Sequence, residues 1–139
     1  MKDAANNFVT DVCNGRGNED VTVTVIAFDN NATNKGTIKN PTIEQLTTII
    51  NKLSADGGTN MRGAVKAATT VLNSDAMLTD AVNYVIVLSD GEPNASQYYC
   101  DSETLNAFRA TNSNAYAIGL GDNYSRSELL KIVNNDSSK

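Results

Sequence analysis

An unbroken apolar run, Val85–Leu88, ends abruptly in the polar turn Ser89-Asp90-Gly91, which is followed by Pro93. Four consecutive apolar residues bounded by turn formers predict a strand that is buried on both faces of a sheet. In open α/β sheets, ligands bind at the edge where such strands end. Asp90 is therefore the first candidate binding residue, although Asp-Gly is also an ordinary turn pair and could do no more than close the turn.

Helices and strands alternate along the rest of the chain. Apolar residues at helical spacing predict helices, and β-branched or continuous apolar runs predict strands. The alternation predicts one α/β domain, in which helices cover both faces of an open, mostly parallel, Rossmann-like sheet. The predicted elements are a helix at Lys2–Val12, a strand at Val21–Phe28 with a short return strand near Thr37-Ile38, helices at 43–54 and 61–72, a helix holding Leu105 and Phe108, a buried strand at 114–118 and a last helix through Val133.

Two of the helix starts have the spacing of a capping box, in which a Ser or Thr and a Glu or Gln three residues later bond each other's backbone N–H. They are Thr42–Gln45 and Ser125–Glu128. Asp101 or the serine after it is expected to cap the helix of Leu105. These patterns predict where the helices begin.

Thr59 ends the glycine-rich turn Asp56–Asn60 and sits where an N-cap belongs. Its hydroxyl would normally accept a hydrogen bond from the backbone two or three residues on. The alternative is a hydroxyl ligand beside the positive end of the helix. The sequence leaves both interpretations open.

Composition excludes several classes of function. The chain contains 0 His, which excludes a Ser-His-Asp or Cys-His triad within it and His-ligated zinc. Its net charge is -5 and it has no long Lys/Arg run, so the sequence shows no basic patch of the kind that binds nucleic acid. No apolar stretch is long enough to cross a membrane. Cys13 and Cys100 are too few for a disulfide framework, and the topology places them at opposite ends of the sheet, so we expect them not to pair with each other.

Three stretches in order carry a family resemblance: D-G-G-T-N-M at 56–61, S-D-G-E-P-N at 89–94 and A-Y-A-I-G-L-G-D at 115–122. Together they resemble the von Willebrand factor type A (vWA) domain over residues 1–139. The resemblance implies a metal-ion-dependent adhesion site (MIDAS) at the C-terminal ends of the strands. By that resemblance Thr59 supplies a hydroxyl and Asp90 a carboxylate to Mg²⁺, or to Mn²⁺ or Ca²⁺, and hard cations of this kind prefer oxygen ligands. The neighbouring rim positions are Gly58, Asn60, Gly91 and Glu92.

The chain also departs from the family pattern. No D-x-S-x-S motif occurs in the sequence, although the family's central first strand ends in one, and the family's final strand and helix have no counterpart. We therefore expect a single, partial vWA domain in which the strand edges at 21–28 and 82–88 stay unpaired unless another segment or chain donates a strand. With two protein ligands, cation binding by this chain alone is expected to be weak or absent.

The resemblance implies a protein-binding or adhesion module, part of a larger cell-surface or secreted protein, that engages an acidic group on a protein ligand. The alternatives are a cytoplasmic vWA scaffold in a multiprotein complex, or a strand-accepting structural domain without metal. An enzyme is not expected, because Gly119-x-Gly121 lacks the third glycine of a dinucleotide fingerprint and no glycine loop is followed by a Walker lysine.

Overall fold

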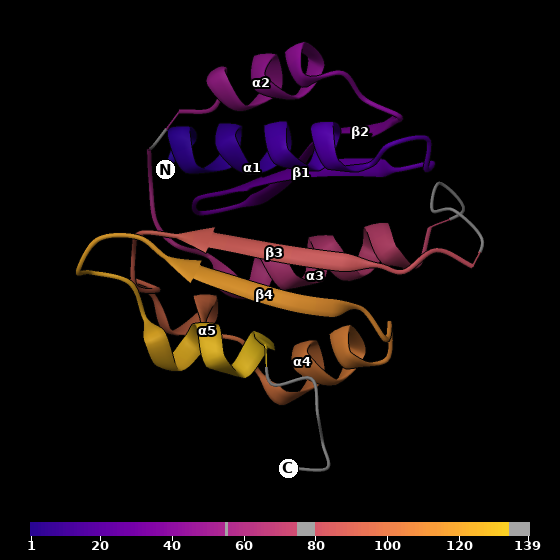
Figure 1. Cartoon of the computed structure of the whole chain (residues 1–139). Coiled ribbons are helices and arrows are strands. Elements are labelled where there is room, and N and C mark those ends of the chain that lie inside the picture. The colour runs from indigo at the N-terminus through magenta and orange to yellow at the C-terminus, as the bar shows by residue number, and fades with distance from the viewer. Residues whose placement is uncertain (55, 75–79, 134–139) are drawn as a thin grey trace.

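The computed structural model describes residues 1–54, 56–74 and 80–133, in which helices and strands alternate as the sequence predicts (Figure 1). The helices are α1 Lys2–Gly15, α2 Ile43–Asn51, α3 Met61–Leu72, α4 Ser102–Arg109 and α5 Arg126–Val133, with a 3₁₀ turn, η1, at Ser96–Tyr98. The strands are β1 Thr22–Phe28, β2 Ala32–Lys39, β3 Tyr84–Ser89 and β4 Asn114–Gly119. The predicted α/β class is confirmed.

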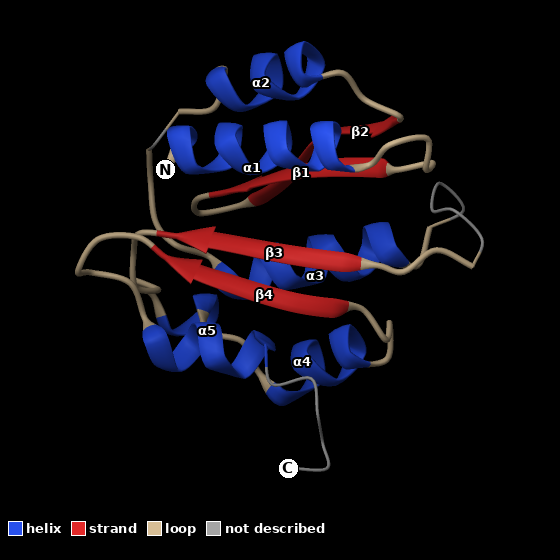
Figure 2. Ribbon diagram, in the orientation of Figure 1, coloured by secondary structure: helices blue, strands red, loops and turns tan. Residues whose placement is uncertain are grey.

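The four strands form two separate two-stranded sheets (Figure 2). β1 pairs antiparallel with β2, with an irregularity between Val25 and Ile26, and β3 pairs in parallel with β4. Within the described ranges no ladder joins β1 to β3, so the expected open sheet is divided in two. Within those ranges the inner edges of β1 and β3 have no strand partner.

Two apolar clusters hold the elements together. In the larger one, side chains of α3, α4 and α5 cover one face of β3 and β4. The smaller one joins α1 and α2 to β1. Ile26 and Phe28 face the larger cluster, whereas Val23 and Val25 face the smaller one, because successive side chains of a strand point to opposite faces. β1 therefore has apolar contacts on both faces.

The prediction that 85–88 and 114–118 are buried strands is only partly right. Val87 is buried, but Tyr84 is 59% exposed, Tyr116 56% and Ile118 42%. Tyr84 and Tyr116 stack on each other with ring centroids 6.4 Å apart. The reason is that α3, α4 and α5 cover only one face of this sheet, so that the side chains on its other face remain open to solvent.

The capping predictions have mixed outcomes. The box at Thr42–Gln45 is formed in both directions, and Asp101 caps α4 by accepting from the Thr104 N–H at 2.8 Å. The cap of α3 is Asn60 and not Thr59, which is a correction of one residue. In the second predicted box, Glu128 turns away from the start of α5 and bonds other partners, as described below.

No helix in these described ranges is long and apolar enough to cross a membrane. Cys13 and Cys100 are free thiols, as expected from their places in the chain. Cys100 is buried, and burial first, followed by the charge of Glu128, raises the pKa of its thiol to about 12. Its thiol is therefore protonated near neutral pH.

Candidate functional site

The loops that follow β1 and β3 meet at one end of the molecule, because both strands run toward it (Figure 1). We call residues 29–31, 56–60 and 89–99 the rim. The backbone of Asn60 donates to the Asp29 carbonyl at 2.8 Å, and its side-chain amide donates to the Asn30 carbonyl at 2.9 Å. The Gly58 N–H donates to the Asn30 side-chain oxygen at 2.9 Å. These bonds fix the loop before α3 to the end of β1.

The Thr59 hydroxyl lies against the backbone of Gly91. A methyl group built on Gly91 would come within 2.6 Å of the Thr59 Oγ1 atom, which is closer than real Cβ contacts. The backbone N–H of Thr59 donates to Asn94 at 3.3 Å, while its hydroxyl makes no hydrogen bond with the described part of the chain. Since Asn60 is the helix cap, the interpretation of Thr59 as a cap alone is wrong.

Asp90 is exposed, and its carboxylate makes no hydrogen bond or ion pair within the residues that the structure describes. The turn after β3 is closed instead by Ser89, whose hydroxyl donates to the Gly91 carbonyl at 3.2 Å and accepts from the Gly91 N–H at 3.4 Å. The side chain of Asp90 is therefore not needed to close the turn.

The rim is acidic. Its loops contain Asp29, Asp56, Asp90 and Glu92 but no Lys or Arg. Tyr99 donates to Glu92 at 3.4 Å, and burial together with the negative charge of Glu92 raises the pKa of the tyrosine. A concentration of acids without basic partners favours a cation near the rim and repels a partner's carboxylate unless a cation lies between them.

The donor atoms suit a hard cation, but only in part. Thr59 and Asp90 provide a hydroxyl and a carboxylate, which are oxygen ligands of the kind that Mg²⁺ takes. Within the described ranges no three Asp, Glu or Cys side chains come together as a cation site. Water, further oxygen donors or a partner's carboxylate would have to complete the coordination shell.

The other predicted rim residues have distinct places. Gly58 lies so close to Asn30 and Asn94 that a Cβ atom would collide with both side chains. Asn60 caps α3 by accepting from Gly63 at 2.8 Å, so its side chain is engaged in the fold. Glu92 is exposed and bonded to Tyr99 as described above.

The sequence interpretation missed Asn30 and Tyr98. The Tyr98 hydroxyl donates to the Asn30 side-chain oxygen at 3.3 Å, so that one amide joins two rim loops. Asn30 follows the end of a predicted strand, and the rule that ligand loops follow strand ends was the signal that could have found it. Tyr98 carries no such signal.

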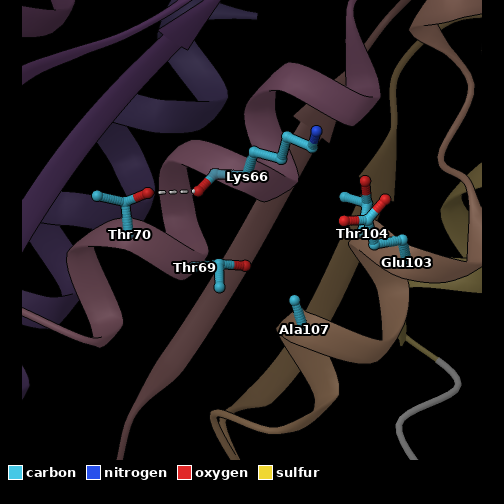
Figure 3. Close-up of a pocket in the computed structure, with 6 residues that line it drawn as sticks. All are labelled: Lys66, Thr69, Thr70, Glu103, Thr104 and Ala107. Atoms are coloured by element: carbon cyan, nitrogen blue, oxygen red, sulfur yellow. Dashed lines mark hydrogen bonds between the residues drawn. The ribbon is translucent and has the colours of Figure 1, made fainter.

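A surface pocket lies away from the rim, between α3 and α4 (Figure 3). It is lined by Lys66, Thr69, Thr70, Glu103, Thr104 and Ala107. The same two helices are joined by an ion pair at 2.6 Å between Arg62 of α3 and Asp101, the N-cap residue of α4. Hydrogen bonding with Thr104, followed by the charge of Arg62, lowers the pKa of Asp101. The pocket shares no residue with the predicted site.

The family model that matches is the von Willebrand factor type A domain, over residues 1–139. A comparison with proteins of curated function finds no match.

Two solved structures share the fold. One is titled von Willebrand factor type A from Catenulispora acidiphila, with a TM-score of 0.73 and 20% identity over 96% of this chain and 32% of that one. The other is proximal thread matrix protein 1 from the mussel byssus, with a TM-score of 0.70 and 21% identity over 95% of this chain and 34% of that one. This chain thus spans about a third of the length of each, and at these identities the likeness concerns the fold.

Proposed function

This chain belongs to the von Willebrand factor type A domain family, whose members generally mediate protein interactions, and we propose that it binds a protein partner through the rim. The observation that carries the proposal is a pair of oxygen groups on neighbouring loops that have no hydrogen-bond partner among the described residues. The Thr59 hydroxyl lies against Gly91, and the Asp90 carboxylate, one residue earlier, is exposed. Binding without catalysis is proposed, since the chain has 0 His and no paired nucleophile and base is predicted.

In this proposal Thr59 and Asp90 hold Mg²⁺, or Mn²⁺ or Ca²⁺, as a partial MIDAS. The bound cation supplies a positive centre for an acidic group of the partner. Asn30 and Asn94 fix the backbone that carries Thr59, and Ser89 fixes the turn that carries Asp90. The acidic rim supports a cation-dependent mode, because the rim would otherwise repel a carboxylate.

The proposed setting is a cell-surface or secreted protein in an adhesion role. The polar, Lys-poor composition and the family's adhesion members support it. A cytoplasmic scaffold in a multiprotein complex is the alternative setting. Immunolocalisation of the native protein in intact and permeabilised cells separates the two, because a surface protein is stained in both.

The test is calorimetric titration of Mn²⁺ and Mg²⁺ into wild type, Asp90→Ala and Asp11→Ala. Asp11 is an exposed aspartate of α1, outside the rim, and is the matched control. We expect a dissociation constant on the order of 1 mM for wild type and for Asp11→Ala, and a loss of binding in Asp90→Ala. Tighter binding is expected when a peptide with a D-x-S-x-S strand is added. Mn²⁺ binding that is the same in all three proteins would contradict the proposal.

A second candidate function, acceptance of a strand from another segment or chain, is favoured by the unpaired edges of β1 and β3. The Asn83 carbonyl accepts from the Asn114 N–H, and the Ser89 carbonyl accepts from the Leu120 N–H. Since backbone groups alternate in direction along a strand, the odd-numbered residues of β3 pair with β4. The N–H and C=O groups of Tyr84, Ile86 and Leu88 therefore point away from β4.

The same reasoning applies to β1. The Val21 carbonyl accepts from Asn40, so Val21, Val23 and Val25 pair with β2. The backbone groups of Thr22 and Thr24 point the other way. Figure 2 shows β1 and β3 facing each other across the division between the sheets, and in this candidate function one added strand pairs with both.

Edge chemistry supports this candidate. Natural sheets protect free edges with charged residues, prolines or bulges. β2 carries Lys35 and Lys39 and pairs irregularly with β1, whereas β1 and β3 contain no charged residue and no proline. The inner edges thus lack the features that prevent strand addition.

Hydrogen exchange with a short apolar strand peptide tests strand acceptance. The expected result is new protection at the amides of Thr24 and Ile86 and none at Val87, whose amide already pairs with β4. A peptide N-methylated at alternate residues, which cannot pair along one edge, is the control and should give less protection. Protection confined to the far edge of β4, or none, would rule out insertion between β1 and β3.

A further inference from the structure

Four consecutive residues, two at the end of the rim and the next two after it, each contact a different part of the molecule. The segment Tyr98–Asp101 runs from the last residue of η1 to the residue before α4. Each of its residues makes a hydrogen bond or ion pair to a side chain distant in the sequence or at the rim. In order, Tyr98 bonds Asn30, Tyr99 bonds Glu92, Cys100 bonds Glu128 and Asp101 pairs with Arg62. We call Tyr98–Asp101 the connecting segment.

The connecting segment reaches both loops of the predicted cation site. Through Tyr98 it is joined to Asn30, which in turn receives the Gly58 N–H from the loop of Thr59. Through Tyr99 it is joined to Glu92, two residues after Asp90. Its position therefore affects both loops.

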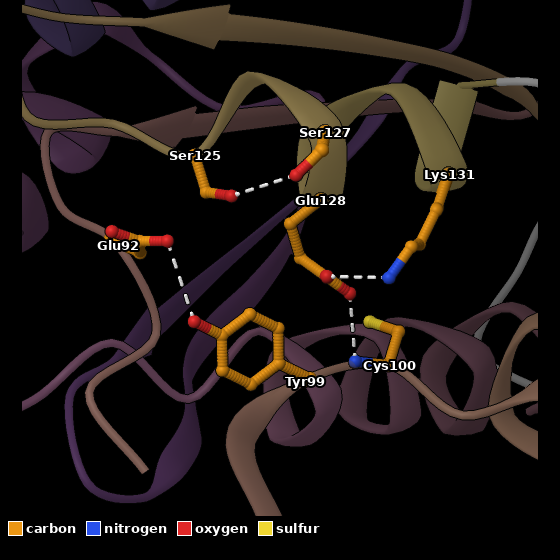
Figure 4. Close-up of polar contacts among 7 residues, drawn as sticks. All are labelled: Glu92, Tyr99, Cys100, Ser125, Ser127, Glu128 and Lys131. Atoms are coloured by element: carbon orange, nitrogen blue, oxygen red, sulfur yellow. Dashed lines mark hydrogen bonds and ion pairs between the residues drawn. The ribbon is translucent and has the colours of Figure 1, made fainter. Parts of the chain in front are cut away.

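Glu128 is the most buried partner of the connecting segment. It lies in the first turn of α5 and is 0% exposed. Its Oε1 atom accepts from the Cys100 backbone N–H at 2.8 Å, and its Oε2 atom accepts from the Lys131 ammonium at 2.9 Å (Figure 4). In the same view Lys131 lies to the right of the Glu128 carboxylate, and Tyr99 and Glu92 lie to its left.

Local helix capping does not explain this arrangement. Ser125–Glu128 has the sequence of a capping box, but the carboxylate points across to Cys100, and the Ser125 hydroxyl lies 3.3 Å from that of Ser127 instead. Burying a carboxylate is costly unless it is paired and hydrogen-bonded. Glu128 is buried, and one of its two carboxylate oxygens accepts from a loop N–H, that of Cys100, so we infer that its role is to hold that loop.

We propose that Glu128 is a positioning residue for the rim: by fixing Cys100 it fixes the connecting segment, and thereby the spacing between the loops of Thr59 and Asp90. The cation part of this inference rests on the proposed function. Glu128 acts through backbone and side-chain contacts and does not itself bind cation or partner. α5 is in this way joined to the loops of Thr59 and Asp90.

The test compares amide hydrogen exchange in wild type, Glu128→Ala, Glu128→Gln and Ile132→Val. Ile132 is a buried residue of the same helix, and its truncation lowers stability while leaving Glu128 in place. In Glu128→Ala we expect about tenfold faster exchange at Cys100, and faster exchange at Gly58 and in the rim loop after β3. Glu128→Gln keeps an acceptor oxygen and should restore most of the protection.

Exchange in Glu128→Ala that is faster at Cys100 alone, or that rises no more at the rim than in Ile132→Val, would overturn the positioning role. Tyr98→Phe provides a second route if Glu128→Ala does not fold. It removes the hydroxyl bond to Asn30 and should speed exchange at Gly58 while leaving Cys100 protected. An unchanged Gly58 amide in Tyr98→Phe would also overturn the inference.

Mn²⁺ titration separates this inference from the proposed function. If wild type binds Mn²⁺, the affinity should fall about tenfold in Glu128→Ala, remain within about twofold in Ile132→Val, and recover in Glu128→Gln. If wild type binds no Mn²⁺ with or without a strand peptide, the proposed cation site fails, and the exchange measurements still decide whether Glu128 positions the rim.

Discussion

Substitution of Gly91 by alanine probes the contact between the two loops of the predicted site. A Cβ atom on Gly91 would lie 2.6 Å from the Thr59 Oγ1 atom, whereas ordinary contact begins at about 3.4 Å. The hydroxyl must therefore move by about 0.8 Å, or the Thr59 side chain must rotate. Gly91 does not have a positive φ, so alanine imposes no backbone strain there.

This displacement of the Thr59 hydroxyl should weaken metal binding much more than it lowers the stability of the fold. Coordination distances in metal sites hold to about 0.2 Å, so a hydroxyl displaced by about 0.8 Å is lost as a ligand. We expect a loss of Mn²⁺ affinity of about tenfold, equivalent to about 1.4 kcal/mol. The free energy of unfolding should change by less than about 1 kcal/mol, because Thr59 is only half-buried and can turn away.

The assay is a double-mutant cycle in Mn²⁺ titration with Gly91→Ala, Thr59→Ala and the double mutant. If Gly91→Ala acts through the Thr59 hydroxyl, it has no further effect once that hydroxyl is removed, so the two losses are not additive. Gly15→Ala is the control, since a Cβ at Gly15 meets nothing within 4 Å. Additive losses, or a Gly91→Ala protein that binds Mn²⁺ like wild type, would refute the reasoning.

Three further outcomes are expected. In mass-spectrometric alkylation at pH 8, Cys13 should react in the native protein and Cys100 only on unfolding, because Cys100 is buried and its pKa is raised to about 12. Folding lowers the pKa of Asp101, so its charge stabilises the fold at pH values above the ordinary pKa of 3.8, and this stabilisation is lost as the pH falls through the lower pKa of the folded state. Asp101→Asn keeps an N-cap residue but not the charge, so its urea unfolding midpoint should fall less steeply in acid than that of wild type. Phe108→Ala, at a side chain 1% exposed, should cost about 3–5 kcal/mol in urea unfolding, whereas Leu130→Ala, on a half-exposed side chain, should cost less than about 1 kcal/mol.

Local patterns were sufficient for most of the elements. The capping box at Thr42–Gln45 involves neighbours in the sequence, and it forms as predicted. Thr59 and Asn60 are both good N-cap residues, so propensity could not decide between them. The structure decides for Asn60 because its amide also bonds Asn30, a residue 30 positions away.

The residues that hold the rim loops in place could not be predicted, because they act through contacts between positions far apart in the sequence. Glu128 has the spacing of a capping residue, but its partner is the Cys100 backbone, 28 positions away in the chain. Asn30 joins Gly58 and Tyr98, which no periodicity relates to it. The candidate ligands Thr59 and Asp90 were found from motifs, whereas the residues that hold their loops in place depend on tertiary structure.

β3 has an exposed face and an unpaired edge, and the two involve different groups of the same residues. The side chains of Tyr84, Ile86 and Leu88 point to the face that α3, α4 and α5 do not cover, and the backbone groups of the same residues point to the edge that β4 does not use. A strand added at the edge would satisfy those backbone groups in the plane of the sheet. It would not cover the stacked rings of Tyr84 and Tyr116, because side chains project from the faces of a sheet and an added strand lies in its plane. Strand pairing and burial of the open face therefore require different contacts. A partner that adds a strand at the edge of β3 leaves the exposed face of the sheet available for another contact.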